Sequence, residues 1–413
     1  RVVMPGSKSH TIRAVAIAAL ADGQSRIGRP LASADTLAAV SAYRAAGARI
    51  SMHDDLWSVT GTAGRIVAPG ETVDVGNSGT TLRMSMGSFA LLRDGSAVLT
   101  GDSQIQRRPA GALVESLNDL GADVKSVRSN GCAPFEVRGR LRGGSTSIKA
   151  VTSQYLSSLI LNTPLGEGES VITVPLLNEA PYVRMTIDWL ERVGIEMDFT
   201  EDLSEFSIPG GQAFTPFDLV IPGDFSSATF FVAAGALPGN EVTLDGLDMS
   251  DSQGDKAVVE YAEVMGAGVV LDGSTIRVTG SQLSCRELDL NATPDALPMM
   301  AVLGCICEGR TTLANVPQAR IKETDRLAVM AEELGRMGAV VRELEDGLVV
   351  EESQLVGAVV DGHGDHRVVM ALAVAGTIAD GETIIEGAEA VNITFPTFFE
   401  LMKSLGADIK LTD

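Results

Sequence analysis

Two helical patterns alternate along the chain, and each recurs about every seventy residues. The first pattern is an amphipathic stretch that ends at a glycine and leads directly into an apolar, strand-like run. Its closing glycines are Gly47, Gly121, Gly194, Gly266, Gly338 and Gly406. Because a glycine just past a helix end adopts the left-handed conformation easily, each copy predicts a helix, a glycine and then a strand.

The second pattern is a helix that is apolar on nearly every side. Its copies end at Gly23, Gly95, Gly168, Gly239, Gly309 and Gly381. Such a helix is expected to be buried all round. The chain is therefore predicted to be an α/β protein of six units, each with an interior helix, an outer helix and strands. Units of this size exceed common solenoid repeats of about 20 to 45 residues, so we expect two domains that divide near residues 221–224.

Bulk composition fits this prediction. The chain has 413 residues, of which 45% are hydrophobic and 21% charged, as in ordinary globular proteins. No apolar run reaches the roughly 18 residues of a membrane span, and no signal-peptide pattern is visible. The four cysteines form no disulfide framework, and Cys305 and Cys307 lie in an apolar run where buried, inert thiols are expected. We therefore expect a cytoplasmic protein without membrane partners.

The formal net charge of -22 argues against nucleic acid as a partner, because a phosphate backbone requires a basic surface. It also makes any local gathering of cations informative. An anionic small molecule would need lysine and arginine concentrated at one site against a repelling background.

Polar segments precede all six interior helices. Helix capping explains their serines and threonines. Capping does not explain Lys8, Arg13, Arg83 and Arg367, which lie just inside apolar helices. A cation there opposes the helix dipole unless an anion is bound at the helix start. We predict anion binding at the first, second and last of these helix starts.

Three further segments carry concentrated charge. QRRP contains Arg107 and Arg108, ARIKETDRL opens an outer helix, and GHGDHR contains His363 and His366. The second segment is also explained by a solvated first turn with ion pairs. A metal site at the two histidines would need further ligands, and the spacing shows none, so no metal is expected.

The motifs PGSKS, GNSGTTLR, RRP, TSQ, PDA, KETDR and GDHR occur in this order. In these motifs the chain resembles, nearly end to end, the 5-enolpyruvylshikimate-3-phosphate synthases of the enolpyruvyl transferase superfamily. The resemblance implies a two-domain inside-out α/β barrel of six βαβαββ units. It implies that residues 6–221 form a domain that binds shikimate 3-phosphate, and that residues 1–5 with 222–413 form the second. The active site is expected in the cleft between the domains.

The resemblance also implies the reaction and its residues. The enolpyruvyl group of phosphoenolpyruvate passes to the 5-hydroxyl of shikimate 3-phosphate, without a cofactor, in a protein expected to be a monomer. The implied catalytic residues are Asp295, Glu323, Lys8 and His366. The implied acceptor-binding residues are Lys8, Ser9, Arg13, Thr152, Ser153, Gln154, Tyr182, Asp295, Gln318 and Lys322. The implied phosphoenolpyruvate-binding residues are Lys8, Asn77, Gly79, Thr80, Arg83, Arg108, Gln154, Arg326 and Arg367.

Within that scheme we hypothesise that Asp295 deprotonates the hydroxyl and that Glu323 exchanges protons with the methylene carbon. Lys8 assists the departing phosphate. Gly79 leaves the donor site unobstructed, so we expect glyphosate to compete with phosphoenolpyruvate. General acid–base steps of this kind each contribute about 10²- to 10⁴-fold.

The chain departs from the family pattern at several positions. Thr152 stands for the usual serine, Gln318 for a common asparagine, and Ile393 for a lysine that many members use on phosphoenolpyruvate. Ile12 stands where asparagine or histidine is frequent. Glu179 replaces a serine and puts a carboxylate near a phosphate, for which Arg184 is a candidate to compensate.

Three alternative functions are less consistent with these residues. A UDP-N-acetylglucosamine enolpyruvyl transferase usually carries a reactive cysteine before its RP motif, and the loop TGDSQIQRRP has none. A non-catalytic anion-binding paralogue would not need to keep Asp295, Glu323 and Lys8. An RNA 3'-phosphate cyclase fits poorly with a charge of -22.

Overall fold

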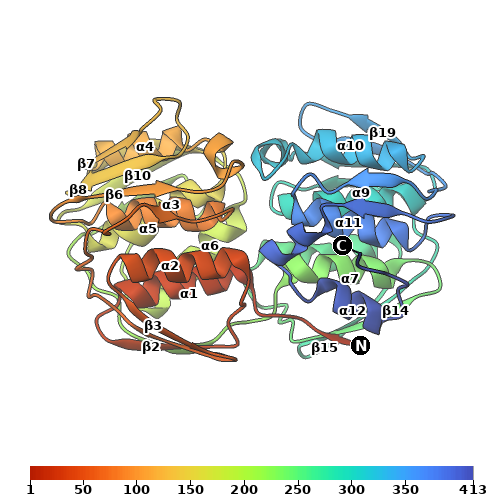
Figure 1. The fold of residues 1–413 in the computed structure, drawn as a ribbon, viewed down its shortest axis with the longest axis horizontal. Helices are drawn as coiled ribbons and strands as arrows, with labels where there is room; N and C mark the ends of the chain where they lie inside the picture. Colours follow the sequence, from red (N-terminus) through yellow and green to blue (C-terminus); the bar gives the residue numbers. More distant parts are fainter. Residues whose placement is uncertain (413) are drawn as a thin grey trace. The chain divides into compact units, whose positions relative to one another are not determined.

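The computed structural model describes residues 1–412. The chain forms two compact units, which we call the first unit (Gly6–Ile221) and the second unit (Arg1–Pro5 with Pro222–Asp413). Both combine helices with mixed sheets in an α/β fold, and many of their helices and strands are labelled in Figure 1.

The first unit contains three four-stranded sheets with the orders β13-β2-β4-β3, β5-β6-β8-β7 and β11-β12-β10-β9. Its helices are α1 (Lys8–Leu20), α2 (Ala34–Ala45), α3 (Gly79–Phe89), α4 (Gly111–Asp119), α5 (Ser153–Asn162) and α6 (Ala180–Arg192). Its strands are β2 (Gln24–Gly28), β3 (Arg49–His53), β4 (Leu56–Thr60), β5 (Val73–Asp74), β6 (Ser96–Thr100), β7 (Ala122–Ser126), β8 (Phe135–Gly139), β9 (Gly144–Ala150), β10 (Ser170–Leu177), β11 (Asp198–Phe199), β12 (Glu205–Ile208) and β13 (Asp218–Val220).

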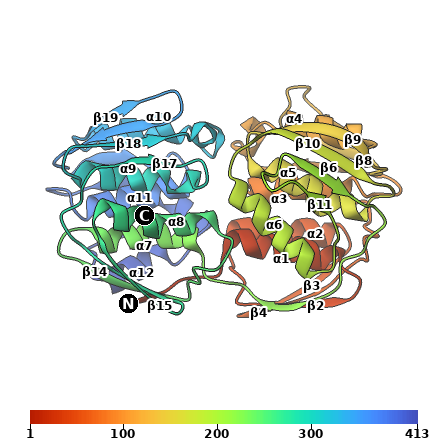
Figure 2. The ribbon, with the colours of Figure 1, turned by 180° about the vertical axis from the view of Figure 1, so that it is seen from behind.

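The second unit contains the four-stranded sheets β1-β14-β16-β15 and β17-β18-β20-β19 and the pair β21-β22, several of which are labelled in Figure 2. Its helices are α7 (Phe225–Ala236), α8 (Ala257–Met265), α9 (Leu297–Ile306), α10 (Arg326–Arg336), α11 (His366–Gly376) and α12 (Phe398–Ser404). Its strands are β1 (Val2–Val3), β14 (Glu241–Asp245), β15 (Gly268–Asp272), β16 (Thr275–Thr279), β17 (Glu287–Asp289), β18 (Arg310–Ala314), β19 (Val340–Glu343), β20 (Leu348–Glu351), β21 (Val359–Asp361) and β22 (Ile384–Glu386).

The sheets share one plan. In each four-stranded sheet, one outer pair is parallel and the remaining pairs are antiparallel, as in β13–β2–β4–β3. The parallel partner of β14 is β1, so Val2 and Val3 pair with Leu244 and Asp245. This pairing is why residues 1–5 belong to the second unit.

The predicted distinction between interior and outer helices is confirmed. All twelve residues of α7 are buried, and α1 is buried from His10 to Leu20. By contrast α10 buries one side only, with Leu327, Met330 and Leu334 among its buried residues. Interior helices α1, α3 and α5 belong to one hydrophobic core, and α7, α9 and α11 belong to a second.

The predicted left-handed glycines are also confirmed. Gly47, Gly121, Gly194, Gly266, Gly338 and Gly406 all have φ between 85° and 114°. At the end of α10, the Gly338 N–H donates to the Gly335 carbonyl and the Ala339 N–H donates to the Leu334 carbonyl. These two hydrogen bonds are the Schellman arrangement, which satisfies carbonyls that a helix end leaves open.

The prediction of a strand after Gly406 is wrong within the described part of the chain. Residues 407–412 form no strand, and the sheet of the sixth repeat, β21-β22, has two strands where the other five sheets have four. The segment holds two larger apolar residues, Ile409 and Leu411, and Leu411 is 61% exposed. A strand is held in place when several of its apolar side chains are buried on one face, and here only one larger apolar side chain is packed.

The cysteines behave as expected. All four thiols are free, and Cys305 and Cys307 are fully buried. Burial raises the pKa of each of these two thiols to about 12, so both stay protonated and unreactive near neutral pH. Within residues 1–412, no helix is long and apolar enough to cross a membrane.

The end of α10 provides a matched test of the repeated glycine. Gly338→Ala places a Cβ on a residue with φ of +87°, so it should lower the free energy of unfolding by about 1 to 2 kcal/mol. Gly335→Ala, inside the same helix and with no atom within 4 Å of the added Cβ, should raise it by about 0.5 to 1 kcal/mol. Urea unfolding followed by circular dichroism measures both, and equal effects of the two substitutions would refute the helix-end assignment.

Candidate active site

The start of α1 carries the first predicted cation. Lys8 Nζ lies 3.2 Å from Oδ2 of Asp35, a buried carboxylate in the first turn of α2. The Thr81 hydroxyl, in the first turn of α3, donates to the Asp35 carbonyl at 3.4 Å. One residue of α2 therefore connects the starts of two interior helices and fixes the position of Lys8.

Arg13 is buried one turn further along α1, with 2% of its surface exposed. Its guanidinium donates to the Thr186 hydroxyl at 2.9 Å, the Tyr182 carbonyl at 2.9 Å and the Ser9 carbonyl at 3.1 Å. These acceptors are neutral, and burial lowers the pKa of Arg13 to about 10, which still leaves it charged near neutral pH. A buried cation held by neutral groups favours an anionic ligand nearby.

Two more guanidinium groups converge on the start of α3. A Cβ added at Gly79 would lie against Arg83 Nη1 and within 2.9 Å of Arg108 Nη1. Both arginines are buried, and Arg83 Nη2 donates to the Pro109 carbonyl at 3.1 Å. Arg107, the other arginine of the RRP motif, is exposed. The second predicted anion site thus consists of a helix start with two adjacent cations.

Amide side chains join this place to the start of α5. Gln154 Nε2 donates to the Thr80 hydroxyl at 3.2 Å, and Asn77 Nδ2 donates to Asp102 and Gln104. The Gln154 Oε1 atom is buried without a hydrogen-bond partner among the described residues. The predicted donor-binding residues of the first unit therefore lie together around α3 and α5.

A carboxylate occupies the start of α5. Glu179 Oε2 accepts hydrogen bonds from Ser153 Oγ at 2.7 Å, Ser153 N at 3.0 Å and Thr152 Oγ1 at 3.1 Å. Arg184 was a candidate to compensate this charge, but its guanidinium donates to the Glu201 carbonyl at 2.7 Å. Arg184 is exposed, whereas Glu179 is buried, so the two side chains lie in different surroundings.

In the second unit the predicted residues surround Arg326, which is 1% exposed. Its guanidinium lies 2.7 Å from carboxylate oxygens of Asp295, Glu323 and Asp365. Arg367 adds a second cation, because its Nη2 lies 2.9 Å from the other oxygen of Asp295. Three helix starts, those of η4 (Pro294–Ala296), α10 and α11, supply this cluster.

The charges within the cluster stabilise each other's ionised forms. Burial is the largest single influence on Arg326 and favours its neutral form, but Asp365, Glu323 and Asp295 together hold the pKa of Arg326 above its ordinary value. Burial likewise opposes ionisation of Asp365, yet the Arg326 charge and its hydrogen bonds hold the pKa of Asp365 below its ordinary value. Arg326 and Asp365 are therefore both ionised near neutral pH.

The remaining predicted residues of the second unit lie on the same segments. His366 is buried at the first position of α11, and Lys322 follows η5 (Pro317–Ile321). Gln318 Nε2 donates to the Asn291 carbonyl at 2.9 Å, while its buried Oε1 has no hydrogen-bond partner in residues 1–412. Each of the two units thus brings its own share of the predicted residues together.

Two departures from the family pattern prove to be apolar packing. Ile12 is completely buried in the core of the first unit. Ile393, at the end of η6 (Ala388–Ile393), packs against the core of the second unit. Neither side chain replaces the polar group that other members carry at its position.

Two carboxylates that contact the predicted site residues were not predicted from the sequence. Asp35 pairs with Lys8, and no local signal marks it because the contact joins two helices. Asp365 could have been predicted from the sequence, because an aspartate directly before an apolar helix is a capping signature. Its Oδ1 accepts from the Arg367 N–H at 2.9 Å while the same side chain binds Arg326.

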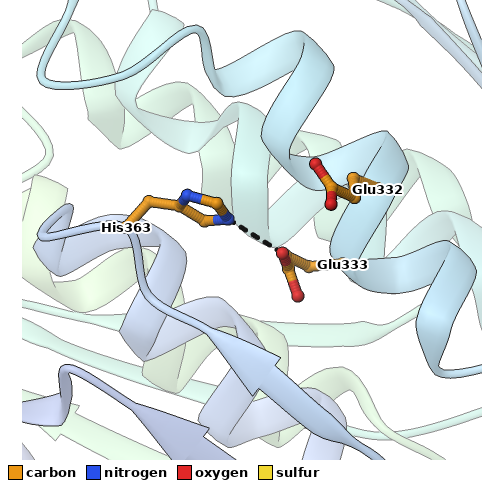
Figure 3. Close-up of side chains that lie close together, drawn as sticks. All are labelled: Glu332, Glu333 and His363. Carbon is orange, nitrogen blue, oxygen red and sulfur yellow. Dashed lines mark hydrogen bonds and ion pairs between the residues drawn. The ribbon is translucent and has the colours of Figure 1, made fainter.

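A further cluster was also missed, and Figure 3 shows it. Glu332, Glu333 and His363 offer oxygen and nitrogen atoms that all lie within 4.8 Å of one another, a spacing that suits a metal ion. His363 Nε2 lies 2.8 Å from Glu333 Oε1, and Arg336 forms ion pairs with both carboxylates. The arginine already supplies the positive charge that a metal would bring, so the cluster is explained as an ion-pair network.

Comparisons with known proteins identify the family of the chain. Residues 1–402 match the family model of EPSP synthase (3-phosphoshikimate 1-carboxyvinyltransferase). A 3-phosphoshikimate 1-carboxyvinyltransferase of Acetivibrio thermocellus is 53% identical over 99% of this chain and 96% of its own length. One from Ruminiclostridium cellulolyticum is 49% identical over 99% of this chain and 97% of its length. The solved EPSP synthase of Acinetobacter baumannii aligns with a TM-score of 0.83 at 27% identity, covering 100% of this chain and 96% of that one.

These likenesses, together with the helix-start cations and the paired carboxylates, define a transferase of the enolpyruvyl class. The chain belongs to the EPSP synthase family, the 3-phosphoshikimate 1-carboxyvinyltransferases. The alternative acceptor UDP-N-acetylglucosamine is not favoured by any of the relatives described above.

The start of α3 yields a test of donor binding. Gly79→Ala inserts a methyl group against two flexible guanidinium ends, so the fold should be kept while Arg83 and Arg108 shift. We expect kcat/KM for phosphoenolpyruvate to fall by about 10- to 100-fold, and inhibition by glyphosate to weaken in parallel.

Gly111→Ala is the control for this substitution, because an added Cβ there meets no atom within 4 Å. Steady-state phosphate release measures both variants. An unchanged KM for phosphoenolpyruvate in Gly79→Ala would show that the two arginines do not bind the donor.

Proposed function

We propose that this chain transfers the enolpyruvyl group of phosphoenolpyruvate to the 5-hydroxyl of shikimate 3-phosphate and releases phosphate. Family membership supports the reaction, and one observation carries the assignment of residues. Asp295 is shared between Arg326 and Arg367, so an ionised carboxylate lies beside two cations suited to a phosphorylated substrate.

We propose a division of labour between the units. In the first unit, Thr152, Ser153 and Arg13 hold the acceptor phosphate, while Arg83 and Arg108 hold phosphoenolpyruvate at the start of α3. Ser9, Gln154 and Tyr182 complete the acceptor contacts, and Asn77, Thr80 and Gln154 complete the donor contacts. In the second unit, Arg326 and Arg367 bind the donor, and Gln318 and Lys322 bind the acceptor.

The reaction is an addition followed by an elimination. Asp295 takes the proton of the 5-hydroxyl, Glu323 gives a proton to the methylene carbon, and the oxygen bonds to the neighbouring carbon. Glu323 then removes a proton from the new methyl group. The carbon–oxygen bond to phosphate breaks, the departing phosphate takes up the proton held by Asp295, and Lys8 stabilises the remaining charge. His366, buried at the start of α11, lies beside Asp365 and tunes the charge of this cluster.

The proton on Glu323 requires a change in the cluster. Its carboxylate is paired with Arg326 at 2.7 Å, and that pairing favours the ionised form. A bound phosphoenolpyruvate would compete for the same guanidinium. Release of Glu323 from Arg326 would then let it carry the proton that the methylene carbon receives.

We further propose that the six sheets mark six units in an inside-out barrel arrangement, three in each domain, of which five have the full βαβαββ order and the last lacks its final two strands within the described residues. The shared plan of the four-stranded sheets supports this. We propose that the protein acts as a monomer. We propose a cytoplasmic location as well, and the four free cysteines fit a reducing compartment.

Acceptor identity is tested by phosphate release. With phosphoenolpyruvate present, shikimate 3-phosphate should support turnover, and UDP-N-acetylglucosamine should give less than about one thousandth of that rate, because a site built for one set of polar groups rejects analogues that leave them unpaired. Turnover with the nucleotide sugar alone would contradict the proposed function. Binding of both substrates without phosphate release would indicate a non-catalytic paralogue.

The role of Asp295 is tested by Asp295→Asn, which keeps the shape and removes the base. We expect kcat to fall by about 10²- to 10⁴-fold, while the Kd of shikimate 3-phosphate changes far less. Asp272→Asn, an exposed carboxylate on β15, is the control for loss of one charge. Rapid-quench turnover and calorimetry separate the two quantities, and an equal loss in binding would assign Asp295 to substrate positioning.

A further inference from the structure

Glu179 occupies the place that the proposed function assigns to the acceptor phosphate. It is 2% exposed, and its Oε2 atom receives three hydrogen bonds from the start of α5. A carboxylate oxygen at a helix start, bound by a backbone N–H and two hydroxyls, presents the same charge and acceptor chemistry as a phosphate oxygen.

We propose that Glu179 is an intramolecular occupant of the acceptor-phosphate site, and that the phosphate of shikimate 3-phosphate must displace its carboxylate to bind. This inference rests on the proposed function. Glu179 would then set the affinity for the acceptor: the chain holds its own anion in the site, where a serine at this position would leave the same donors open.

The local backbone explains why the carboxylate reaches this place. Glu179 precedes α6 with φ of +59°, a left-handed conformation that is unusual for a glutamate. The preceding residue is anchored to the β9 end of the sheet, because the Asn178 N–H donates to the Ala150 carbonyl at 3.1 Å and its Nδ2 donates to the Val151 carbonyl at 3.2 Å. These contacts fix the backbone and direct the side chain toward α5.

Displacement needs no movement of the fold. The Tyr182 N–H donates to the Glu179 carbonyl at 3.0 Å, so the backbone of residue 179 is part of the first turn of α6. The carboxylate lies at the end of three rotatable bonds and can rotate away while that turn stays in place. It cannot remain, because two anions a few ångströms apart repel strongly where water is excluded.

The competition is specific for a phosphorylated ligand. Shikimate lacks the phosphate and does not require the donors of Thr152 and Ser153. The Glu179 carboxylate therefore lowers the affinity for shikimate 3-phosphate and leaves the affinity for shikimate almost unchanged. This difference separates displacement of an anion from a general structural role of Glu179.

The experiment is calorimetric binding of shikimate 3-phosphate and of shikimate to the full chain and its variants. Glu179→Ser should bind shikimate 3-phosphate at least about tenfold more tightly, since the hydrogen bonds to the Glu179 carboxylate no longer have to be broken. Glu179→Gln should also bind more tightly, because the amide keeps the shape without the charge. Affinity for shikimate should stay within about threefold in both variants.

Glu191→Gln, an exposed residue of α6, controls for the loss of one negative charge from the same helix and should change neither affinity. Equal weakening of both ligands in Glu179→Ser and Glu179→Gln would overturn the proposal, and so would unchanged affinity for shikimate 3-phosphate. If Glu179→Ser does not fold, as judged by its melting temperature, the Glu179→Gln comparison decides alone.

Phosphate release by the wild-type chain is measured in parallel. Its absence would refute the proposed function. Normal release together with unchanged acceptor affinity in the variants would refute only the displacement of Glu179.

Discussion

A positive charge buried in a protein needs negative charges or hydrogen-bond acceptors around it. This constraint organises the segments of both units that carry the candidate site residues. Arg326 shows it most clearly, because its guanidinium is almost completely buried and lies against three carboxylates from three different segments. Removing one partner from such a cluster leaves an uncompensated charge in a place where water cannot screen it. The loops before α9, α10 and α11 are thus held to one another through a single side chain.

The first unit meets the same constraint differently. Arg13 is held by a hydroxyl and two carbonyls, and Arg83 and Arg108 converge at one helix start. Lys8, by contrast, is paired with the buried carboxylate of Asp35. The Glu179 carboxylate is a second buried anion of this unit, and it is bound by two hydroxyls and a backbone N–H.

Sequence reasoning succeeded where the signal is local or periodic. The left-handed glycines and the buried helices follow from spacing and hydrophobicity within a single segment, and the cations inside apolar helices stood out against the charge of -22. It did less well where the decisive contact joins distant segments. The pairing of Lys8 with Asp35 and of Glu333 with His363 depends on how helices pack. The contact of Arg184 with the Glu201 carbonyl likewise joins two segments that the sequence does not place together.

The pairing of β1 with β14 has a consequence for how the chain is assembled. Val2 and Val3 meet residues that follow them by more than two hundred positions, with the whole first unit between them. The first unit is one continuous segment and can complete its sheets as soon as it has been synthesised. The sheet that contains β1 cannot form until β14 has been synthesised. Until then the backbone groups of β1 have no partner strand. Long-range pairing of this kind is slow, because the closing of a large loop precedes any gain from contact. The order of translation therefore favours early folding of the first unit. During that time the short apolar strand β1 stays unpaired.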